Sequence, residues 1–424
     1  MSPSNVLPIP QLKPAISIGP YEAATDHVPP RFLLALDDQY FLVSAKARAL
    51  VAALLRKPSD GEQLEQAYAA ESGEHLPAAT LLALAEKTLP ALLFIDAPAT
   101  PRQLPFIVSL TLLGPRLAAR VTRRLAWLFT PQLAVVLVGL FLVLHLAVLP
   151  DALRLAHADW SARQSVALFA LFMLSGLVHE LGHTSACRYF GCPHGGIGFG
   201  LYFVFPAWYA DVTRAWQLER RQRAVVDLGG VYFQSIFLIA VDACALATGD
   251  PLAYKLAWLI TFAMLFTLNP VFKFDGYWLL SDLSGLHNLH KQVRASVGGM
   301  LATLLGRRTP ATPNVRGAIL YAYSLLSACY FLYFGLFLGR ELLSLGSSLV
   351  PKLSATWAAL RAAGGGGGAW DMLAAAGAFA ATLSWPVLVL AASGFFLDKL
   401  RRAVANIAAG VREARTLPVH GKTA

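Results

Sequence analysis

The hydrophobic positions of this chain follow one pattern up to about residue 100 and another beyond about residue 125. The first part mixes polar and apolar residues at the spacing of short strands and helices. The second part contains apolar runs long enough to cross a bilayer, which takes about 20 residues of helix. Six runs are predicted to span a membrane: 125–149, 166–190, 224–248, 252–272, 317–341 and 372–397. The pattern therefore predicts an all-α polytopic membrane protein of about six transmembrane helices with a small N-terminal domain.

The residues before these runs predict a folded α+β domain. Apolar and aromatic residues on both sides of Asp37-Asp38 indicate a β-hairpin with a polar turn, and Ser44 is a candidate N-cap for the helix that follows. Helices are predicted over about 44–56, 60–70 and 77–94. A hairpin with three helices is typical of a winged-helix-like domain, expected here over 21–100 after a mobile, Pro-rich segment at 1–20. A generic adaptor domain is the alternative interpretation.

Composition strengthens the case for a membrane protein. Of the 424 residues, 56% are apolar and 14% are charged, whereas soluble domains carry about 25% charged residues. The net charge of +10 comes largely from Lys and Arg in alternate loops, as expected for cytoplasmic loops that face anionic lipid headgroups. No basic stripe interleaved with aromatic residues is found. We therefore expect the lipid bilayer as a partner and no nucleic acid.

The same charge bias predicts a topology. Both termini are expected on the cytoplasmic side of the cell (inner) membrane, with the chain crossing it several times. The membrane core is expected over 101–345, an outside Gly-rich loop over 346–370, and the sixth span with a cytoplasmic tail over 371–424. The four cysteines lie in or beside apolar runs and are expected to be reduced and structural. The sequence leaves the oligomeric state open.

The second apolar run contains the sequence His179-Glu180-Leu181-Gly182-His183. On a helix, residues four apart share one face, so the two imidazoles can bind one cation. Glu180 lies about 100° around the helix and can act beside the metal as a general base. Three polar side chains inside an apolar run are unfavourable unless they face the protein interior and find partners. The motif therefore predicts a zinc site with peptidase chemistry, and a helix with incidental polar residues is the alternative.

Two histidines leave a catalytic zinc one protein ligand short, because such sites use three protein ligands. A candidate third ligand follows the fourth apolar run, in Asn269-Pro270-Val-Phe-Lys-Phe-Asp275-Gly276. Pro270 interrupts the helix, and the expected topology places Asp275 at a depth similar to that of the histidines. The alternative is an Asp-Gly turn beyond a membrane helix. His194 with Cys192 is a weaker metal candidate, because Gly and Pro residues around it indicate a plain turn.

These two motifs, in this order and topology, resemble the site-2 protease family of intramembrane zinc metalloproteases over roughly residues 165–285. The resemblance implies zinc ligation by His179, His183 and Asp275 and catalysis by Glu180. It also implies that Asn269 helps to hold the substrate or the oxyanion. Residues 197–211 resemble the family's membrane-embedded β-hairpin, which presents an edge to an extended substrate.

The chain departs from the family pattern at three positions. Phe272 stands where many bacterial members have a second proline, Phe274 where leucine is usual, and Gly176 where a larger residue is common. A PDZ-like insertion is absent. The variant with Lys273-Phe-Asp-Gly-Tyr-Trp is similar instead to the peptide zinc metalloproteases found near genes for ribosomally made, modified peptides. The N-terminal domain resembles the PqqD-like domain, which captures leader peptides by strand addition.

We therefore expect a zinc metalloendopeptidase that cleaves near the cytoplasmic face and matures a modified peptide precursor. Regulated cleavage of a membrane-bound regulatory protein is one alternative, and a non-catalytic zinc-containing peptide carrier or export partner is another. Asp227 with Gly229-Gly230 either borders the site or serves close helix packing, and packing is favoured. Asp242 is expected to make a polar contact between helices.

Overall fold

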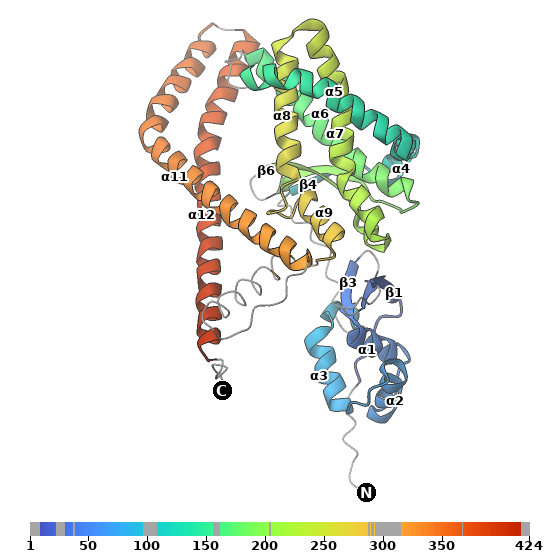
Figure 1. The fold of residues 1–424 in the computed structure, drawn as a ribbon. Coiled ribbons are helices and arrows are strands. Elements are labelled where there is room, and N and C mark those ends of the chain that lie inside the picture. The colour runs from blue at the N-terminus through green and yellow to red at the C-terminus, as the bar shows by residue number, and fades with distance from the viewer. Residues whose placement is uncertain are drawn as a thin grey trace, which may run out of the picture.

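A computed structural model describes residues 9–22, 30–36, 39–95, 108–155, 162–202, 205–286, 289, 292, 315–366 and 368–416. Figure 1 shows a small N-terminal domain at one end of a helical body, with two long helices crossing beside that body. In this part of the chain the four cysteines are free, as expected.

The N-terminal domain is a three-stranded antiparallel sheet backed by three helices. The strands are β1 (Ser17–Glu22), β2 (Arg31–Leu36) and β3 (Gln39–Ser44), in the order β1-β2-β3. The helices are α1 (Ala45–Leu55), α2 (Gly61–Ser72) and α3 (Ala78–Thr88), followed by a short 3₁₀ helix, η1 (Ala91–Leu93). Ser44 Oγ accepts from the Ala47 N–H at 3.3 Å, which is the expected N-cap. Leu34, Leu50, Leu64 and Leu81 are fully buried between sheet and helices.

The N-terminal boundary differs from the expected one. Residues 17–20 belong to β1, and Leu12 and Ile16 are buried in the domain core, so 9–20 is not a mobile segment. The burial of these apolar side chains offsets the poor strand propensity of Gly19 and Pro20. Residues 1–8 and the expected Asp37-Asp38 turn lie outside the described residues, although Leu36 and Gln39 pair across the turn. The winged-helix class stays a prediction.

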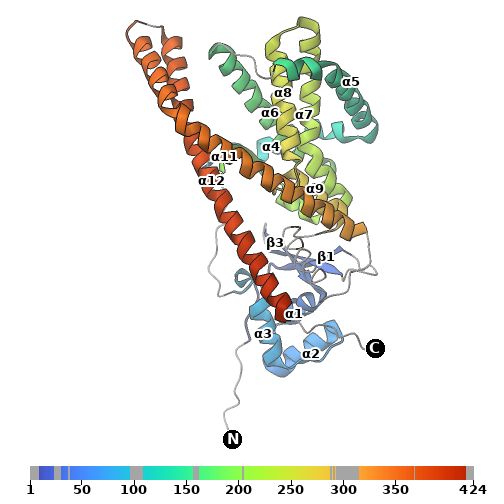
Figure 2. The same cartoon turned by 60° about the vertical axis from the view of Figure 1, so that its left-hand side comes forward.

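The helical body is built around α7. Its elements are α4 (Pro115–Leu125), η2 (Ala126–Phe129), α5 (Pro131–Leu155), α6 (Ala162–Tyr189), η3 (Thr213–Gln217), α7 (Arg220–Thr248), α8 (Pro251–Thr267) and α9 (Asp275–Ser284). Helix α7 packs against α5, α6, α8 and α9 (Figure 2). Leu238 of α7 and Ile260 of α8 are fully buried in the cluster that joins α5, α7 and α8. Helix α7 can therefore contribute to a site formed with α6 and α9.

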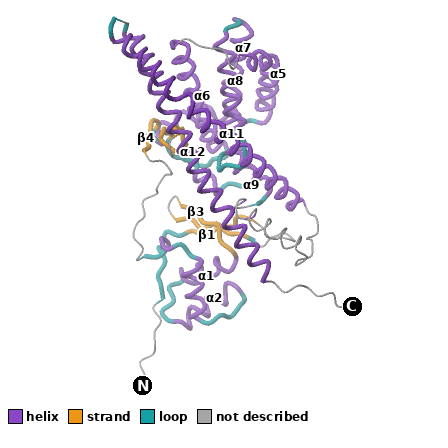
Figure 3. The backbone as a smooth tube through the Cα atoms, turned by 90° about the vertical axis from the view of Figure 1, so that its left-hand side faces the viewer, coloured by secondary structure: helices purple, strands orange, loops and turns teal. Residues whose placement is uncertain are grey.

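The chain ends in a hairpin of two long helices, α11 (Val315–Gly364) and α12 (Ala369–Thr416), which pack against each other (Figure 3). Tyr323 near the start of α11 lies in one buried cluster with Tyr277 of α9. Residues 346–364, expected to form part of an outside loop, are helical. The physical reason is composition, because Ala and Leu dominate residues 353–363 and favour helix.

Among the described residues, four helices are long and apolar enough to cross a membrane: Pro131–Leu155, Gln164–Tyr189, Arg220–Thr248 and Gly317–Gly364. Val135 and Val143 on α5 are 73% and 70% exposed, as suits side chains that face lipid. These helices indicate a membrane protein. The expected count of six is not confirmed, because α8 has 17 residues and only Ala369–Ala380 of α12 could be judged as an apolar stretch among the described residues.

A second three-stranded sheet lies beside α6. The expected hairpin over 197–211 is present as β5 (Ile197–Tyr202) and β6 (Phe205–Ala210). A third strand, β4 (Val108–Leu113), pairs antiparallel with β5 and gives the order β4-β5-β6. This strand was not expected, because its partner lies about ninety residues further along the sequence. Strand β6 forms the edge that faces α6.

Candidate metal centre

The centre begins with a close crossing of α6 and α7. A Cβ atom on Gly182 would lie 2.1 Å from the carbonyl oxygen of Gly229, which no side chain permits. The two backbones can therefore touch, as small residues allow in packed membrane helices. A Cβ atom on Gly230 would lie 2.4 Å from Cε1 of His179, so the imidazole itself rests on α7. Gly229 and Gly230 thus serve helix packing, as expected, and Gly230 also borders the site.

Three side chains converge at this crossing. His179 Nε2 lies 3.0 Å from Asp275 Oδ2, and His183 Nε2 lies 3.3 Å from the same oxygen. The two Nε2 atoms are 3.0 Å apart. Ligands bound tetrahedrally to one zinc at about 2.0–2.1 Å would be roughly 3.3 Å from one another. The triangle of donor atoms therefore fits a single ion, and we call His179, His183 and Asp275 the His–His–Asp cluster.

The proton positions on the two imidazoles also indicate that the three atoms fit one metal ion. His183 Nδ1 donates to the carbonyl oxygen of Val226 at 2.7 Å, since a carbonyl can only accept. His179 Nδ1 faces Oε1 of Gln234 at 3.0 Å and donates to it. Both Nε2 atoms then carry lone pairs that point toward each other and toward a carboxylate oxygen. Asp275 Oδ2 is buried without a hydrogen-bond donor. Three acceptors so close together fit a cation between them.

Asp275 reaches the histidines because helix α8 stops short. Leu268 closes α8, and a turn over 269–274 leads directly into α9, whose first residue is Asp275. Gly276 allows this approach, because a Cβ atom there would lie 1.9 Å from the carbonyl oxygen of Leu268. The interruption that Pro270 predicted is therefore present, and it brings the carboxylate to α6.

Glu180 lies outside the triangle but beside it. Its carboxylate is close to the His–His–Asp cluster and to the backbone of Ala210, the last residue of β6. A Cβ atom on Gly176, one turn earlier on α6, would lie 2.4 Å from Cδ1 of Trp208 in β6. The Trp208 indole therefore fills the space that a larger residue would take at position 176. The general base predicted from sequence thus sits between the ligand helix and the edge strand.

Asn269, predicted to hold substrate, lies in the turn between α8 and α9. Its Oδ1 atom accepts from the Val271 N–H at 3.0 Å, as in an Asx turn. The carboxamide NH₂ is therefore the part that can donate to a ligand. No measured contact joins Asn269 to the cluster, so its role stays a prediction.

The weaker metal candidate is not part of any cluster. His194 Nδ1 donates to the Gly195 carbonyl at 2.9 Å, and its Nε2 accepts from Thr122 Oγ1 at 2.8 Å. Burial lowers the pKa of His194, which keeps the ring neutral. The Cys192 thiol donates to the Pro193 carbonyl. Within the described ranges, His179, His183 and Asp275 form the only group of at least three His, Cys, Asp or Glu residues with metal-binding spacing.

Sequence reasoning missed the residues that support the ligands. Gln234 and the Val226 carbonyl fix the two imidazoles, and both belong to α7 rather than to a motif. A glutamine inside the apolar run 224–248 was the available signal for Gln234. Asp227 was not missed: it was expected to border the site or to serve helix packing, and it lies close to the cluster with its Oδ2 atom buried without a hydrogen-bond partner.

A second polar cluster lies elsewhere in the helical body. His145 Nδ1 faces Asp242 Oδ2 at 3.0 Å, and His145 Nε2 faces Thr261 Oγ1 at 2.9 Å. These residues belong to α5, α7 and α8. The prediction that Asp242 makes a polar contact between helices is therefore confirmed. We call these three residues the His145 cluster.

No protein-family model matches the chain, and no solved structure matches it either. Part of the chain is similar to a Bacillus subtilis (strain 168) protein named "Putative peptide zinc metalloprotease protein YydH", at 26% identity over 139 residues. The match covers 32% of this chain and 54% of that protein, so the chain spans about half the length of the curated relative it matches. This distant, partial likeness supports a zinc metalloprotease family and zinc as the metal.

Proposed function

We propose that this chain is a membrane zinc metalloendopeptidase of the site-2 protease type. The observation that carries the proposal is the convergence of three acceptor atoms within 3.0–3.3 Å, with a glutamate beside them that is not one of the three. A structural zinc site is closed by four protein ligands, whereas a catalytic one keeps a position open next to a general base. The His–His–Asp cluster, with three ligands and Glu180 beside them, has the composition of a catalytic site.

Each residue then has a distinct task. His179, His183 and Asp275 hold the ion, with the imidazoles fixed through Gln234 and Val226. A bound zinc ion supplies a Lewis acid that polarises a carbonyl and makes water acidic. Glu180 accepts the proton from the attacking water and returns it to the leaving amine. The Asn269 NH₂ group hydrogen-bonds the substrate carbonyl.

The edge strand offers a way to hold the substrate. Strand β6 lies at one edge of its sheet, and Ala210 at its end is close to Glu180. An extended peptide that pairs with β6 would be aligned along the site, since strand addition fixes a peptide through backbone hydrogen bonds. This arrangement favours an enzyme over a peptide carrier, because a carrier needs no base at the edge of its binding strand.

The substrate class rests on the N-terminal domain. Its sheet has two edge strands, β1 and β3, to which the leader of a ribosomally made, modified peptide precursor could add. We propose that this PqqD-like domain holds the leader while the body cleaves the precursor near the cytoplasmic face. The membrane is the cell (inner) membrane, crossed several times, with both termini cytoplasmic.

The test compares the detergent-purified protein with Glu180→Gln on a precursor peptide encoded beside the gene. Zinc content is measured on both, and Glu86→Gln on the exposed side of α3 serves as a matched control. We expect about one zinc in each protein and cleavage by all but Glu180→Gln. Zinc-loaded wild-type protein that cleaves neither the precursor nor a membrane-anchored peptide would favour the carrier. Cleavage of the anchored peptide alone would favour a membrane-bound regulator as the substrate.

A further inference from the structure

The sheet of the N-terminal domain has one face on its own helices and the other on the membrane body. Ile18 and Phe41 pack into the domain core, so Tyr40, next to Phe41 on β3, points to the opposite face. Tyr21 lies at the irregularity between Pro20 and Glu22 in β1, and its contacts place it against the body. The Gln217 Nε2 donates to the Tyr40 hydroxyl at 2.8 Å, and the Tyr21 ring lies 6.1 Å from that of Trp216. Both partners belong to η3 of the body.

Arg223 joins this contact to the interior of the body. Its guanidinium carbon lies 4.4 Å from the centre of the Tyr21 ring, within cation–π distance. On the other side, Nε and Nη2 donate to the two oxygens of Asp282 at 2.9 and 2.8 Å. Nη1 donates to the Leu218 carbonyl at 2.8 Å. Arg223 is only 5% exposed, so its charge is held by these fixed partners.

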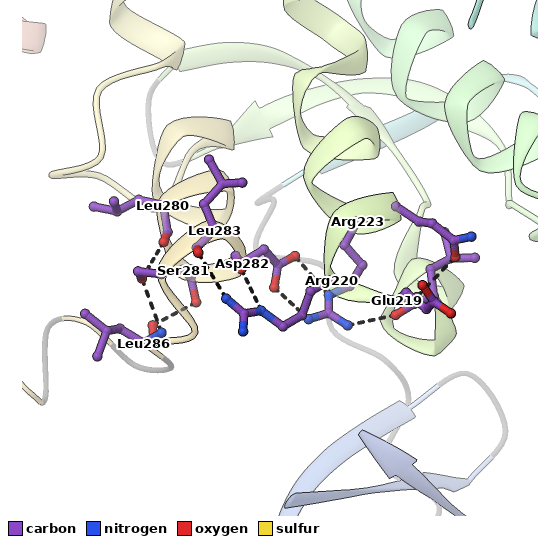
Figure 4. A network of polar contacts seen from close by, with 11 residues as sticks. Glu219, Arg220, Arg223, Leu280, Ser281, Asp282, Leu283 and Leu286 are labelled. Carbon is purple, nitrogen blue, oxygen red and sulfur yellow. Dashed lines mark hydrogen bonds and ion pairs between the residues drawn. The ribbon is translucent and has the colours of Figure 1, made fainter. Parts of the chain in front are cut away.

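Asp282 lies on α9, the helix that begins with Asp275. The two aspartates are seven residues apart, which places them on one face about 10 Å from each other. Figure 4 shows Arg220 and Arg223 reaching from α7 to the last turn of α9. Arg220 Nε and Nη2 donate to the carbonyls of Asp282 and Leu283 at 2.8 and 3.0 Å. Because one short helix of 10 residues carries both aspartates, the position of Asp282 constrains that of Asp275.

A second route connects the same two places. The Trp216 ring, already in contact with Tyr21, lies 5.7 Å from the Trp278 ring in an edge-to-face arrangement. Trp278 follows Asp275 by three residues on α9. Tyr21 of the N-terminal sheet is therefore connected to α9 by two routes. Arg223 leads to the C-terminal end of α9, and the Trp216–Trp278 pair leads to its N-terminal half.

We propose that Arg223 is a positioning residue through which the docked N-terminal domain sets the place of Asp275 in the metal centre. The inference rests on the proposed function, because it takes Asp275 to be a zinc ligand. Loss of the Tyr21 ring face leaves Arg223 and α9 less constrained, and the carboxylate then meets the imidazoles less often. Peptide that binds at the N-terminal sheet would act on zinc affinity by the same route.

The test measures zinc affinity by competition with a chelator, using zinc alone as the probe. Tyr21→Leu removes the π face, Tyr21→Phe keeps it, and Arg48→Lys is the matched control. Arg48 lies 5.2 Å from the Phe32 ring, a cation–π contact inside the N-terminal domain. We expect Tyr21→Leu to weaken zinc binding about tenfold, the lower end of the range for supporting residues, with Tyr21→Phe and Arg48→Lys unchanged.

A double-mutant cycle separates positioning from general stability. Tyr21→Leu and Asp282→Asn should weaken zinc binding less than additively when combined, because both act through Arg223. Should Tyr21→Leu fail to fold, Tyr21→Met fills the same space without a π face and carries the same test. Unchanged zinc affinity in a folded Tyr21→Leu or Tyr21→Met protein overturns the inference while leaving the proposed function intact. A wild-type protein that binds no zinc overturns both.

Discussion

The helical body contains two buried histidine–aspartate clusters that differ in how their polar atoms are satisfied. In the His145 cluster, one imidazole nitrogen faces a carboxylate and the other faces a hydroxyl, which can donate or accept. In the His–His–Asp cluster, two unprotonated nitrogens and one carboxylate oxygen face one another. In the first arrangement both ring nitrogens have a partner and three helices are tied together, although Asp242 Oδ1 is buried without a hydrogen-bond partner. The second has the composition and spacing that fit a cation, so the same residue types give a structural link in one place and a candidate metal centre in the other.

The largest effect is expected on catalysis, when the base beside the His–His–Asp cluster is removed. Glu180→Gln removes the base beside the His–His–Asp cluster without removing a ligand. We expect kcat to fall about 10²–10⁴-fold, the range typical of general acid–base catalysis, with zinc content unchanged. Peptide cleavage followed by mass spectrometry measures this effect. A variant that cleaves at the wild-type rate would remove Glu180 from the mechanism.

Zinc removal should distinguish the two clusters by stability. Only the His–His–Asp cluster gains from the ion, so a chelator should lower the free energy of unfolding by about 2.7 kcal/mol relative to free zinc at 100 times its Kd. Thermal unfolding in detergent with and without chelator gives the shift. In a His183→Ala protein the chelator should have no such effect, and an equal shift there would mean that the metal binds elsewhere.

The glutamine that supports the metal centre is expected to act on affinity. Gln234→Ala removes the acceptor for His179 Nδ1, so the ring loses its fixed orientation. Zinc affinity should fall about 10- to 100-fold, as for other residues that orient metal ligands. Chelator competition measures this change. Gln66→Ala, which removes an exposed glutamine from α2 of the N-terminal domain instead, should leave the affinity within a few fold of wild type.

The smallest effect on the site should come from the His145 cluster. Asp242→Ala leaves His145 without its acceptor, which destabilises the protein by about 1–3 kcal/mol. Zinc affinity should stay at the wild-type value, because no described contact joins the two clusters. Thermal unfolding and chelator competition on one preparation check both statements. Loss of zinc from a folded Asp242→Ala protein would contradict the separation.

Features formed by residues close together in the sequence could be predicted, whereas features formed by residues far apart in the sequence could not. His179 and His183 share a helix face through spacing alone, and the interruption at Pro270 indicated where Asp275 would lie. Strand β4 escaped notice because residues 108–113 show no local sign of their partner in β5. The support from Gln234 depends on how α6 crosses α7, which the contact of Gly182 with Gly229 determines. The long helix α11 also runs through Pro351, which sequence rules read as a helix end.

The contact between Gly176 and Trp208 means that the size of the side chain on helix α6 limits the size of the side chain on strand β6. One residue on α6 and one on β6 share the space at this point. A larger side chain at one position therefore leaves room only for a smaller one at the other. A related protein with a bulky residue at the first position would be expected to carry a small one at the second. In this chain the bulk at that point stands on the edge strand, at Trp208, and not on helix α6.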